Sequence, residues 1–216
     1  MSVAGGFAKH SLAIASSHIG SAEKQFRFPL EYGNQRPLSA TWTVTGSGGF
    51  IVSKEMGPVK IQGITTGKIV DYGMEDPMNM GACMAPAAAE VIYQHFVDFG
   101  SKPEDYDAVY TGDLGEVGKK ILLHLLRENG YDLSKVHGDC GIEIYENETQ
   151  DTHSGGSGCA CSAVVLASMI IPKIIDGTWK KVLFVPTGAL MSKTSFNEGE
   201  NVAGIAHAIL LEGVRE

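Results

Sequence analysis

A run of glycines that leads through small residues into an apolar segment most restricts the fold of this chain. Residues 153–163 read HSGGSGCACSA, and the apolar segment 164–171 follows directly. Glycine lets the backbone turn tightly and approach another group closely, and the first N–H groups of a helix have no partners within that helix. The sequence therefore predicts a tight turn that opens a buried helix.

This glycine turn, residues 155–159, has two interpretations. Its N–H groups can bind a carboxylate, a phosphate or a developing oxyanion. Alternatively, the small residues only allow the helix to pack closely on a sheet, with no ligand. On the first interpretation the candidate ligand-binding residues are Gly155, Gly156, Ser157, Gly158 and Cys159.

Strand and helix patterns alternate along the rest of the chain. The patterns predict strands at 12–15, 40–52 with a break at 46–49, 59–65, 107–110, 141–145, 181–186 and 203–211. They predict helices at 2–8, from Pro86 in a first turn to about 99, from an Asp113 N-cap to 128, and from the glycine turn to 172–177. From residue 107 the order is β-α-β-α-β-β, and the start of the chain reads like the end of that order. An α/β fold of two related halves is expected, with an incomplete first half in 1–80 and a second half in 81–216.

Composition and motifs argue against several classes of protein. The 44% hydrophobic and 19% charged residues fit an ordered core, and the net charge of -8 without a basic stripe argues against nucleic-acid binding. The apolar runs are too short to span a bilayer, and the N-terminus has no signal-peptide pattern. Metal, nucleotide and nicotinamide motifs are missing from the sequence, so we expect no cofactor.

The four cysteines have no disulfide or zinc spacing, and we expect a reducing compartment. Cys159 and Cys161 stand at the predicted helix start, where a thiolate has a lowered pKa and can be nucleophilic. Small cysteines at such a position also serve as packing residues. No neighbouring histidine can be assigned as a base, and this favours packing.

Two further residues are candidates for the ligand. His18 follows an apolar strand, where ligands of α/β folds bind, and Arg27 carries a guanidinium suited to a carboxylate. The alternatives are a solvated turn histidine and an arginine that pairs with Glu23 or Glu31. His153 is either a ligand contact or an ordinary loop histidine.

Several short motifs resemble the stage V sporulation protein AD family of spore-forming bacteria, which has a thiolase-like fold. These motifs are Ser16-Ser17-His18, residues 22–29 (AEKQFRFP), residues 43–48 (TVTGSG), residues 84–89 (MAPAAA), Thr111-Gly112-Asp113-Leu114 and residues 155–163 (GGSGCACSA). The resemblance implies a layered thiolase-like arrangement of duplicated halves. It also implies that the segment with the thiolase-type cysteine would precede Met1.

The resemblance further implies a noncatalytic protein that binds dipicolinic acid (pyridine-2,6-dicarboxylic acid) and supports its uptake into the developing spore. Its implied partners are the other stage V sporulation membrane proteins and a second copy of the chain. Its implied location is peripheral, on the cytoplasmic side of the spore inner membrane in the forespore.

The alternative is an acyltransferase of the thiolase or 3-oxoacyl synthase class. Such enzymes use a cysteine with histidine and asparagine, or with two histidines. Here Thr111-Gly112-Asp113 stands where a catalytic histidine is expected, and Ser157 stands where an asparagine is expected. These departures favour binding over catalysis.

Overall fold

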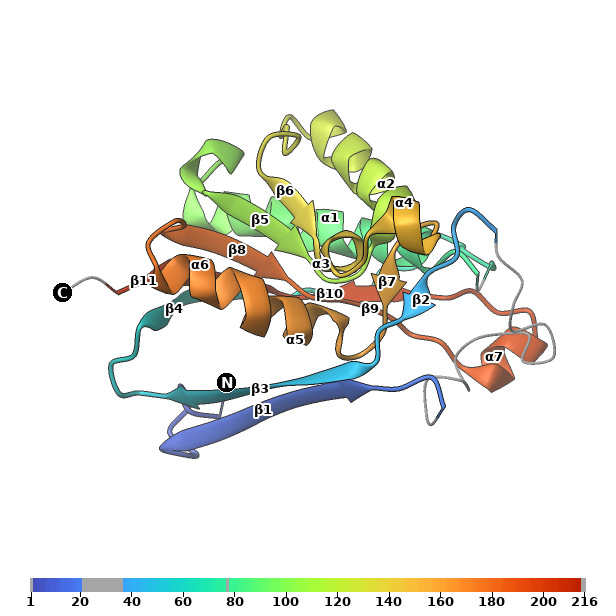
Figure 1. The fold of residues 1–216 in the computed structure, drawn as a ribbon. Helices are drawn as coiled ribbons and strands as arrows, with labels where there is room; N and C mark the ends of the chain where they lie inside the picture. Colours follow the sequence, from blue (N-terminus) through green and yellow to red (C-terminus); the bar gives the residue numbers. More distant parts are fainter. Residues whose placement is uncertain (1, 21–36, 77, 215–216) are drawn as a thin grey trace.

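A five-stranded mixed sheet lies at the centre of the computed structural model, which describes residues 2–20, 37–76 and 78–214 (Figure 1). The strand order is β4-β11-β8-β5-β6; β8, β5 and β6 run parallel, and β11 is antiparallel to β8 and β4. The bounds are β4 Val59–Thr65, β5 Ala108–Thr111, β6 His137–Asp139, β8 Lys181–Val185 and β11 Ala208–Gly213. A strand from residues 1–80 therefore shares a sheet with strands from 81–216.

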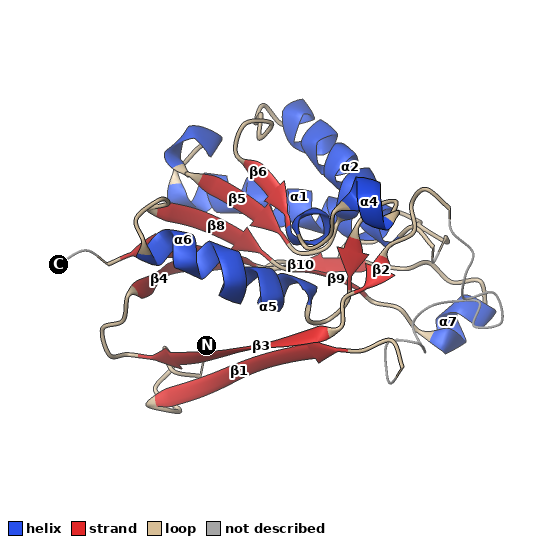
Figure 2. Ribbon diagram, viewed as in Figure 1, coloured by secondary structure: helices blue, strands red, loops and turns tan. Residues whose placement is uncertain are grey.

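Helices cover both faces of this sheet because its strands carry apolar side chains on both faces. Val109, Leu183 and Leu210 belong to the core on the side of α1 (Met80–Phe99) and α2 (Gly115–Glu128). Tyr110 and Phe184 belong to the core on the opposite side, where the helix after the glycine turn packs. The predicted α/β layering is confirmed (Figure 2).

The helix that follows the glycine turn is continuous but contains a π-helical turn between two α-helical parts. It consists of α5 (Cys161–Val165), the π-helical turn η4 (Leu166–Ile170) and α6 (Ile171–Ile175). Pro172 lies in the first turn of α6, and the N–H of Ile171 bonds to the carbonyl of Leu166. Proline cannot donate a helical hydrogen bond, and a π-turn just before it lets the helix continue. The helix ends at Ile175, with Asp176 as its C-cap, within the range that the sequence predicts.

A two-stranded antiparallel ribbon forms the outer layer beyond this helix (Figure 1). It pairs β1 (His10–Ser17) with β3 (Gly46–Ser53), and Leu12 lies opposite Ile51. The predicted break at 46–49 is wrong, because these residues continue β3 and pair with the end of β1. Glycine is needed at position 48 because the strand touches the backbone of Ala163 there.

Shorter elements connect the layers. They are β2 (Trp42–Thr43), parallel to β7 (Gly156–Ser157); β9 (Thr187–Ala189), antiparallel to β10 (Gly204–Ala206); η3 (Pro103–Asp105), α3 (Cys140–Glu143), α4 (Asn147–Gln150) and α7 (Lys193–Asn197).

Three predicted elements differ from the structure. Residues 2–6 form turns instead of a helix, and Gly6 has a positive φ of 80°. The strand expected at 141–145 is the short helix α3, because the Asp139 carboxylate accepts the N–H of Gly141 and starts a helical turn. The last strand is divided at the exposed His207, and β10 before it pairs with β9 instead of joining the main sheet.

The position of the proline in α1 also differs from expectation, and a histidine of this helix is buried. Pro86 lies inside α1 instead of in its first turn. His95 is completely buried; its Nδ1 is 2.8 Å from the Thr65 hydroxyl and its Nε2 is 3.0 Å from the Tyr106 hydroxyl. The ring also stacks on Phe99. His95 of α1 is therefore joined to β4 through Thr65 and to the residue after η3 through Tyr106.

Candidate functional site

A pocket of about 220 Å³ lies against the glycine turn. Its polar lining comes from Asp113, which follows β5, from Thr187, which follows β8, and from residues 157–159 and Ser162. The carboxyl ends of parallel strands are where ligands of open α/β sheets bind. Three methionines close the apolar side: Met80, Met84 and Met191.

The glycine turn has the backbone geometry that its sequence predicts. Gly155 has φ +106° and Gly158 has φ +126°, both in the range that favours glycine. The carbonyls of Gly155 and Ser157 accept the N–H groups of Trp42 and Val44, each at 2.9 Å. The turn is therefore held by hydrogen bonds to β2 and to Val44, the residue after it.

N–H groups of the glycine turn and of the two residues after it have partners within the chain. The N–H of Gly158 donates to the Asp113 carboxylate at 3.0 Å, and the N–H of Ala160 donates to the Ser17 hydroxyl at 3.0 Å. The N–H of Cys161 donates to the Gly158 carbonyl at 2.9 Å. A ligand carboxylate can bind the Gly158 N–H only where Asp113 gives way.

Asp113 is not the N-cap of α2, contrary to the sequence-based expectation. That helix has Leu114 at its N-cap position, without a side-chain capping bond. Asp113 instead joins two loops: its Oδ1 accepts the Thr187 hydroxyl at 2.9 Å, and its Oδ2 accepts the Gly158 N–H. Its own N–H donates to the Thr187 hydroxyl at 3.2 Å. Asp113 thus fixes the β8–β9 connection against the glycine turn.

Asp139 holds the start of α2. It is only 1% exposed, and it accepts the N–H groups of Leu114 and Gly115, each at 3.0 Å, and the Thr111 hydroxyl at 2.6 Å. The N–H of Gly141 also donates to it, at 3.1 Å. Burial raises the pKa of Asp139, and its hydrogen bonds oppose that shift. One buried carboxylate thus orders three segments beneath the pocket.

The two cysteines of the turn lie in different environments. Cys161 is completely buried, and burial, followed by the charges of Asp113 and Asp139, raises the pKa of its thiol. Its Sγ is 3.9 Å from the Gly112 carbonyl, so it is a packing residue. Cys159 is exposed and lines the pocket. None of the described residues that line the pocket is a histidine.

The structure brings together three of the seven candidate ligand residues. Ser157, Gly158 and Cys159 line the pocket. Gly155 and Gly156 are buried behind it, and a Cβ on Gly156 would be 2.7 Å from Ile144 Cγ2. These glycines therefore serve the close packing of the turn.

The other two candidates do not join the described pocket. His18 is exposed, its Nδ1 accepts the N–H of Gly20 at 2.9 Å, and it is not among the lining residues. Arg27 lies outside the described residues. His153, in the loop before the turn, has Nδ1 3.0 Å from the Pro37 carbonyl and Nε2 3.3 Å from Asp151.

Sequence reasoning missed Thr187 and the methionines, and it gave Asp113 another role. The signal for Thr187 was available, because it follows a predicted strand as closely as Asp113 follows another. The methionines come from separate segments, and no spacing in the sequence connects Met191 with Met80.

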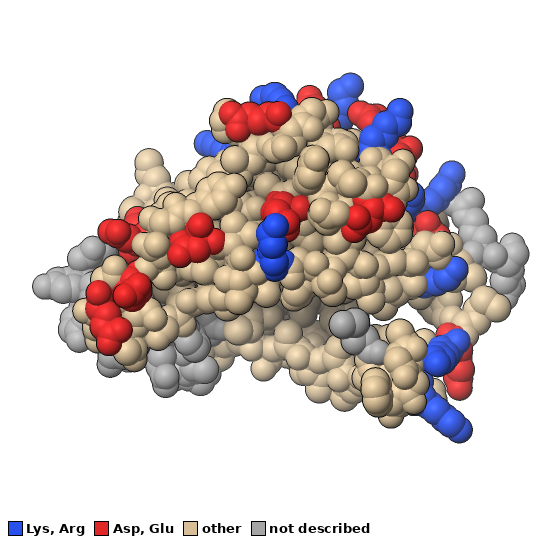
Figure 3. Space-filling view, turned by 180° about the vertical axis from the view of Figure 1, so that it is seen from behind, with Lys and Arg blue, Asp and Glu red and all other residues tan. Residues whose placement is uncertain are grey.

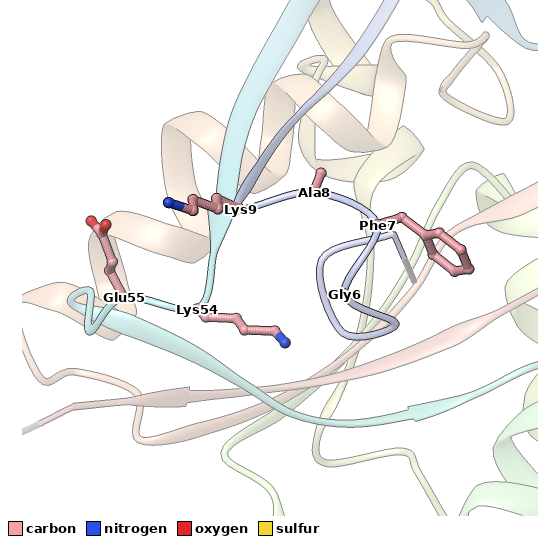
Figure 4. Close-up of a pocket in the computed structure, with 6 residues that line it drawn as sticks. All are labelled: Gly6, Phe7, Ala8, Lys9, Lys54 and Glu55. Atoms are coloured by element: carbon pink, nitrogen blue, oxygen red, sulfur yellow. The ribbon is translucent and has the colours of Figure 1, made fainter.

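A second hollow, of about 350 Å³, lies at the other end of the β1–β3 ribbon. Lys9, Lys54 and Glu55 line it together with residues 6–8, and Figure 4 shows Lys54 pointing from the end of β3 toward the loop that holds Gly6. Two lysines make this hollow more cationic than the glycine-turn pocket. It is therefore the control site for any acidic ligand.

Surface charge and membrane features add little to the site. On the face drawn in Figure 3, acidic and basic side chains of the described residues are interspersed. Within residues 2–20, 37–76 and 78–214, no helix has the length and hydropathy of a membrane span. In the same ranges, no three His, Cys, Asp or Glu side chains are grouped so that they could hold a metal ion.

Comparison with solved structures shows a thiolase-like fold. A tetronic acid condensing enzyme aligns with TM-score 0.56 and 13% identity over 98% of this chain and 62% of that one. The 3-oxoacyl-acyl-carrier-protein synthase III of Aquifex aeolicus VF5 aligns with TM-score 0.51 and 15% identity over 98% of this chain and 60% of that one. At these identities the likeness establishes the fold alone.

Sequence comparison establishes the family. Residues 1–212 match the family described as stage V sporulation protein AD (SpoVAD). The stage V sporulation protein AD of Bacillus subtilis strain 168 is 48% identical over 97% of this chain, and the chain spans 62% of that protein's length. The chain belongs to the SpoVAD family of sporulation proteins.

Proposed function

We propose that this chain is a noncatalytic binder of dipicolinic acid and that it supports uptake of this acid into the developing spore. The observation that carries the proposal is the glycine-turn pocket, which combines hydrogen-bonding groups with an apolar wall and has no histidine among its described lining residues. Membership of the SpoVAD family of sporulation proteins supports a role in sporulation. The chain spans 62% of the length of the Bacillus subtilis protein. Uptake is an activity of the whole protein, and we include it in the proposal for that reason.

The size of the pocket favours a small ligand. Its volume of about 220 Å³ is below the roughly 300–1,000 Å³ of sites for drug-sized ligands. A single ring with two carboxyl groups suits such a space better than a nucleotide-bearing cofactor. The thioethers of Met80, Met84 and Met191 can pack on the flat ring, and the Ser162 hydroxyl can donate to a carboxylate.

The cysteines support binding over acyl transfer. A nucleophilic cysteine needs a lowered pKa and an adjacent base. Cys161 is buried with a raised pKa. Cys159 is exposed at the pocket and, among the described lining residues, is the feature that favours the acyltransferase alternative. A Cys159→Ser variant that still binds dipicolinate with unchanged affinity would count against that alternative.

Calorimetric titration with dipicolinate tests the proposal. We expect Ser162→Leu, which fills the pocket, to weaken binding at least tenfold. Ser168→Leu is the matched control, because Ser168 is exposed on the same helix and does not line the pocket. We expect Lys54→Ala to leave the affinity unchanged.

Two results would contradict this assignment. Loss of binding in Lys54→Ala with retention in Ser162→Leu would move the ligand to the lysine-lined hollow. Equal binding of dipicolinate and benzene-1,3-dicarboxylate would show that the ring nitrogen is not recognised and that the pocket takes dicarboxylates in general.

The proposal includes a homodimer, membrane partners from the stage V set and a peripheral location on the cytoplasmic side of the spore inner membrane. The outer face of the β1–β3 ribbon supports the dimer, since Leu12, Ile14 and Ile51 are 62%, 66% and 77% exposed. Analytical ultracentrifugation checks it. We expect a dimer for the chain and a monomer for Ile51→Lys.

A further inference from the structure

The two most exposed large hydrophobic side chains of the described residues lie at one end of the β1–β3 ribbon. Phe7 is 89% exposed and Met56 is 88% exposed. Phe7 comes just before β1, and Met56 lies in the turn between β3 and β4. Because β1 and β3 are antiparallel, these two loops close the same end of the ribbon. Single exposed hydrophobic residues are common on protein surfaces, but two such extremes at one place indicate an interaction surface.

Hydrogen bonds within both loops order the backbone that carries these side chains. The N–H of Phe7 donates to the Ser2 carbonyl at 2.9 Å, and Val3 between them is buried. In the second loop the N–H of Glu55 donates to the Ser53 hydroxyl at 3.2 Å. Figure 4 shows the Phe7 ring pointing away from the hollow that the two loops share. The apolar side chains are therefore presented to the outside by formed turns.

Two lysines lie between the loops. Lys9 and Lys54 line the shared hollow, and both are exposed. Within residues 2–20, 37–76 and 78–214, neither lysine forms an ion pair. The acidic side chain in the lining, Glu55, lies 3.5 Å from His10 Nε2 instead. The two ammonium groups are thus available to an anionic partner.

Protruding apolar side chains beside unpaired lysines match the chemistry of an acidic lipid surface. Acidic headgroups attract lysines, and apolar side chains enter the boundary between the headgroups and the acyl chains. A small anion would use the lysines alone and would leave Phe7 and Met56 in water. The net charge of the chain is -8, so an acidic bilayer repels the molecule as a whole and attracts this cationic end. The charge distribution therefore selects which side faces the bilayer.

We propose that residues 6–9 and 54–56 form a membrane-docking end that binds bilayers of acidic phospholipids. The lysines bind the headgroup phosphates, while Phe7 and Met56 enter the bilayer surface. The inference rests on the proposed function only for the peripheral location, and it names the surface and the class of lipid that produce it. It does not depend on the ligand of the glycine-turn pocket, whose lining shares no residue with this hollow.

Vesicle sedimentation tests the contribution of the lysines. The vesicles contain either phosphatidylcholine and phosphatidylglycerol in equal parts or phosphatidylcholine alone. We expect the unsubstituted chain to bind the acidic vesicles more tightly, and Lys54→Glu to weaken that binding by roughly tenfold. Lys120→Glu is the matched control, because it changes the net charge equally at an exposed position of α2, which lies on the other side of the central sheet from the ribbon (Figure 1). We expect it to leave the binding unchanged.

A second pair of variants tests the apolar contact. We expect Phe7→Ser to weaken binding to the acidic vesicles by roughly tenfold, because the ring no longer leaves water. Leu38→Ser is the matched control, since Leu38 is 82% exposed and does not line the hollow. Tryptophan at the same two positions reports insertion directly. The emission of Phe7→Trp should shift to shorter wavelength on acidic vesicles, and that of Leu38→Trp should not.

The outcomes separate this inference from the proposed function. No binding to acidic vesicles, or equal binding by the unsubstituted chain, Lys54→Glu and Phe7→Ser, would overturn the membrane-docking end. Calorimetric titration of the same proteins with dipicolinate tests the pocket assignment separately, and we expect these variants to bind dipicolinate as the unsubstituted chain does. Vesicle binding that glycerol 3-phosphate abolishes and that Phe7→Ser does not weaken would show a site for a phosphate group alone, and the bilayer assignment would be wrong.

Discussion

Gly48 of β3 lies directly against Ala163 of α5, because a Cβ at position 48 would be 2.8 Å from the Ala163 carbonyl oxygen. We therefore expect Gly48→Ala to push the ribbon from the helix and to lower the free energy of unfolding by about 1–3 kcal/mol. The neighbouring Gly49 is the control, since a Cβ there would meet no atom within 4 Å. Urea denaturation should show Gly49→Ala within about 0.5 kcal/mol of the unsubstituted chain. Equal effects of the two substitutions would contradict this packing.

Asp139→Asn should destabilise the fold more than any exposed aspartate substitution does. The asparagine offers one acceptor oxygen and two N–H donors where the carboxylate accepts the N–H groups of Leu114, Gly115 and Gly141. At least one buried donor then loses its partner, so we expect a loss of about 1–3 kcal/mol in the free energy of unfolding. Asp132→Asn serves as control, because Asp132 is exposed. A loss no larger than that of the control would contradict the role of Asp139 at the start of α2.

Two histidines with lowered pKa values, the buried His95 and the partly buried His137, should make the protein sensitive to acid. Burial, with a smaller contribution from Lys181, lowers the pKa of His95 from 6.5 to about 4, and burial, followed by Lys119, lowers that of His137 from 6.5 to about 3. Between these values and pH 6.5 the unfolded chain binds more protons than the folded chain. The contribution of the neutral rings to the free energy of unfolding is therefore complete above pH 6.5. As the pH falls through this range, each histidine lowers the free energy of unfolding by about 1.4 kcal/mol per pH unit.

His95→Gln provides the check. Its unfolding free energy should depend less steeply on pH between 6 and 4.5 than that of the unsubstituted chain, in chemical denaturation at each pH. His124→Gln is the surface control, because His124 is exposed and its Nε2 lies 3.4 Å from the Glu128 carboxylate. Identical slopes for all three proteins would show that His95 titrates normally.

Thiol chemistry should distinguish Cys159 from the other three cysteines. Cys159 is exposed, while Cys83, Cys140 and Cys161 are buried. Burial, with the charge of Asp71 second, raises the pKa of Cys83 to about 12, and burial also raises the pKa of Cys140 and Cys161. We expect a disulfide reagent to titrate one thiol in the folded chain and four after denaturation, and none in folded Cys159→Ser. Rapid modification of two or more thiols in the folded chain would contradict the buried positions.

The sequence predicts the layers of helices and sheet well, because the spacing of hydrophobic residues indicates which face of a helix or strand is buried. The strands 59–65 and 181–185 and the helix that ends near Gly130 match their patterns, since hydrophobic spacing and glycine punctuation are local signals. Residues 141–145 were misread because the Asp139 side chain starts a helical turn, and an apolar run alone does not show where a capping carboxylate lies.

The site is less predictable because its polar partners are far apart in the chain. Gly158 and Asp113 are 45 residues apart, and Thr187 is 74 residues from Asp113. The glycine run correctly indicates a turn with special backbone geometry, yet it does not reveal that a side chain of the protein binds that turn. His18 illustrates the opposite error, since its position after a strand does not bring it to the pocket.

The hydrogen bonds from the glycine turn to Asp113 and Ser17 also determine how the protein behaves without a ligand. The Asp113 carboxylate accepts the Gly158 N–H of the turn, and the Ser17 hydroxyl accepts the N–H of Ala160 just after it, so these contacts hold the shape of the turn from within the protein. Under the proposed function, ligand binding is an exchange of partners within a structure that is already formed, in contrast to proteins whose sites become ordered only when filled. The proposed site would then fill and empty with the concentration of its ligand while the fold stays the same.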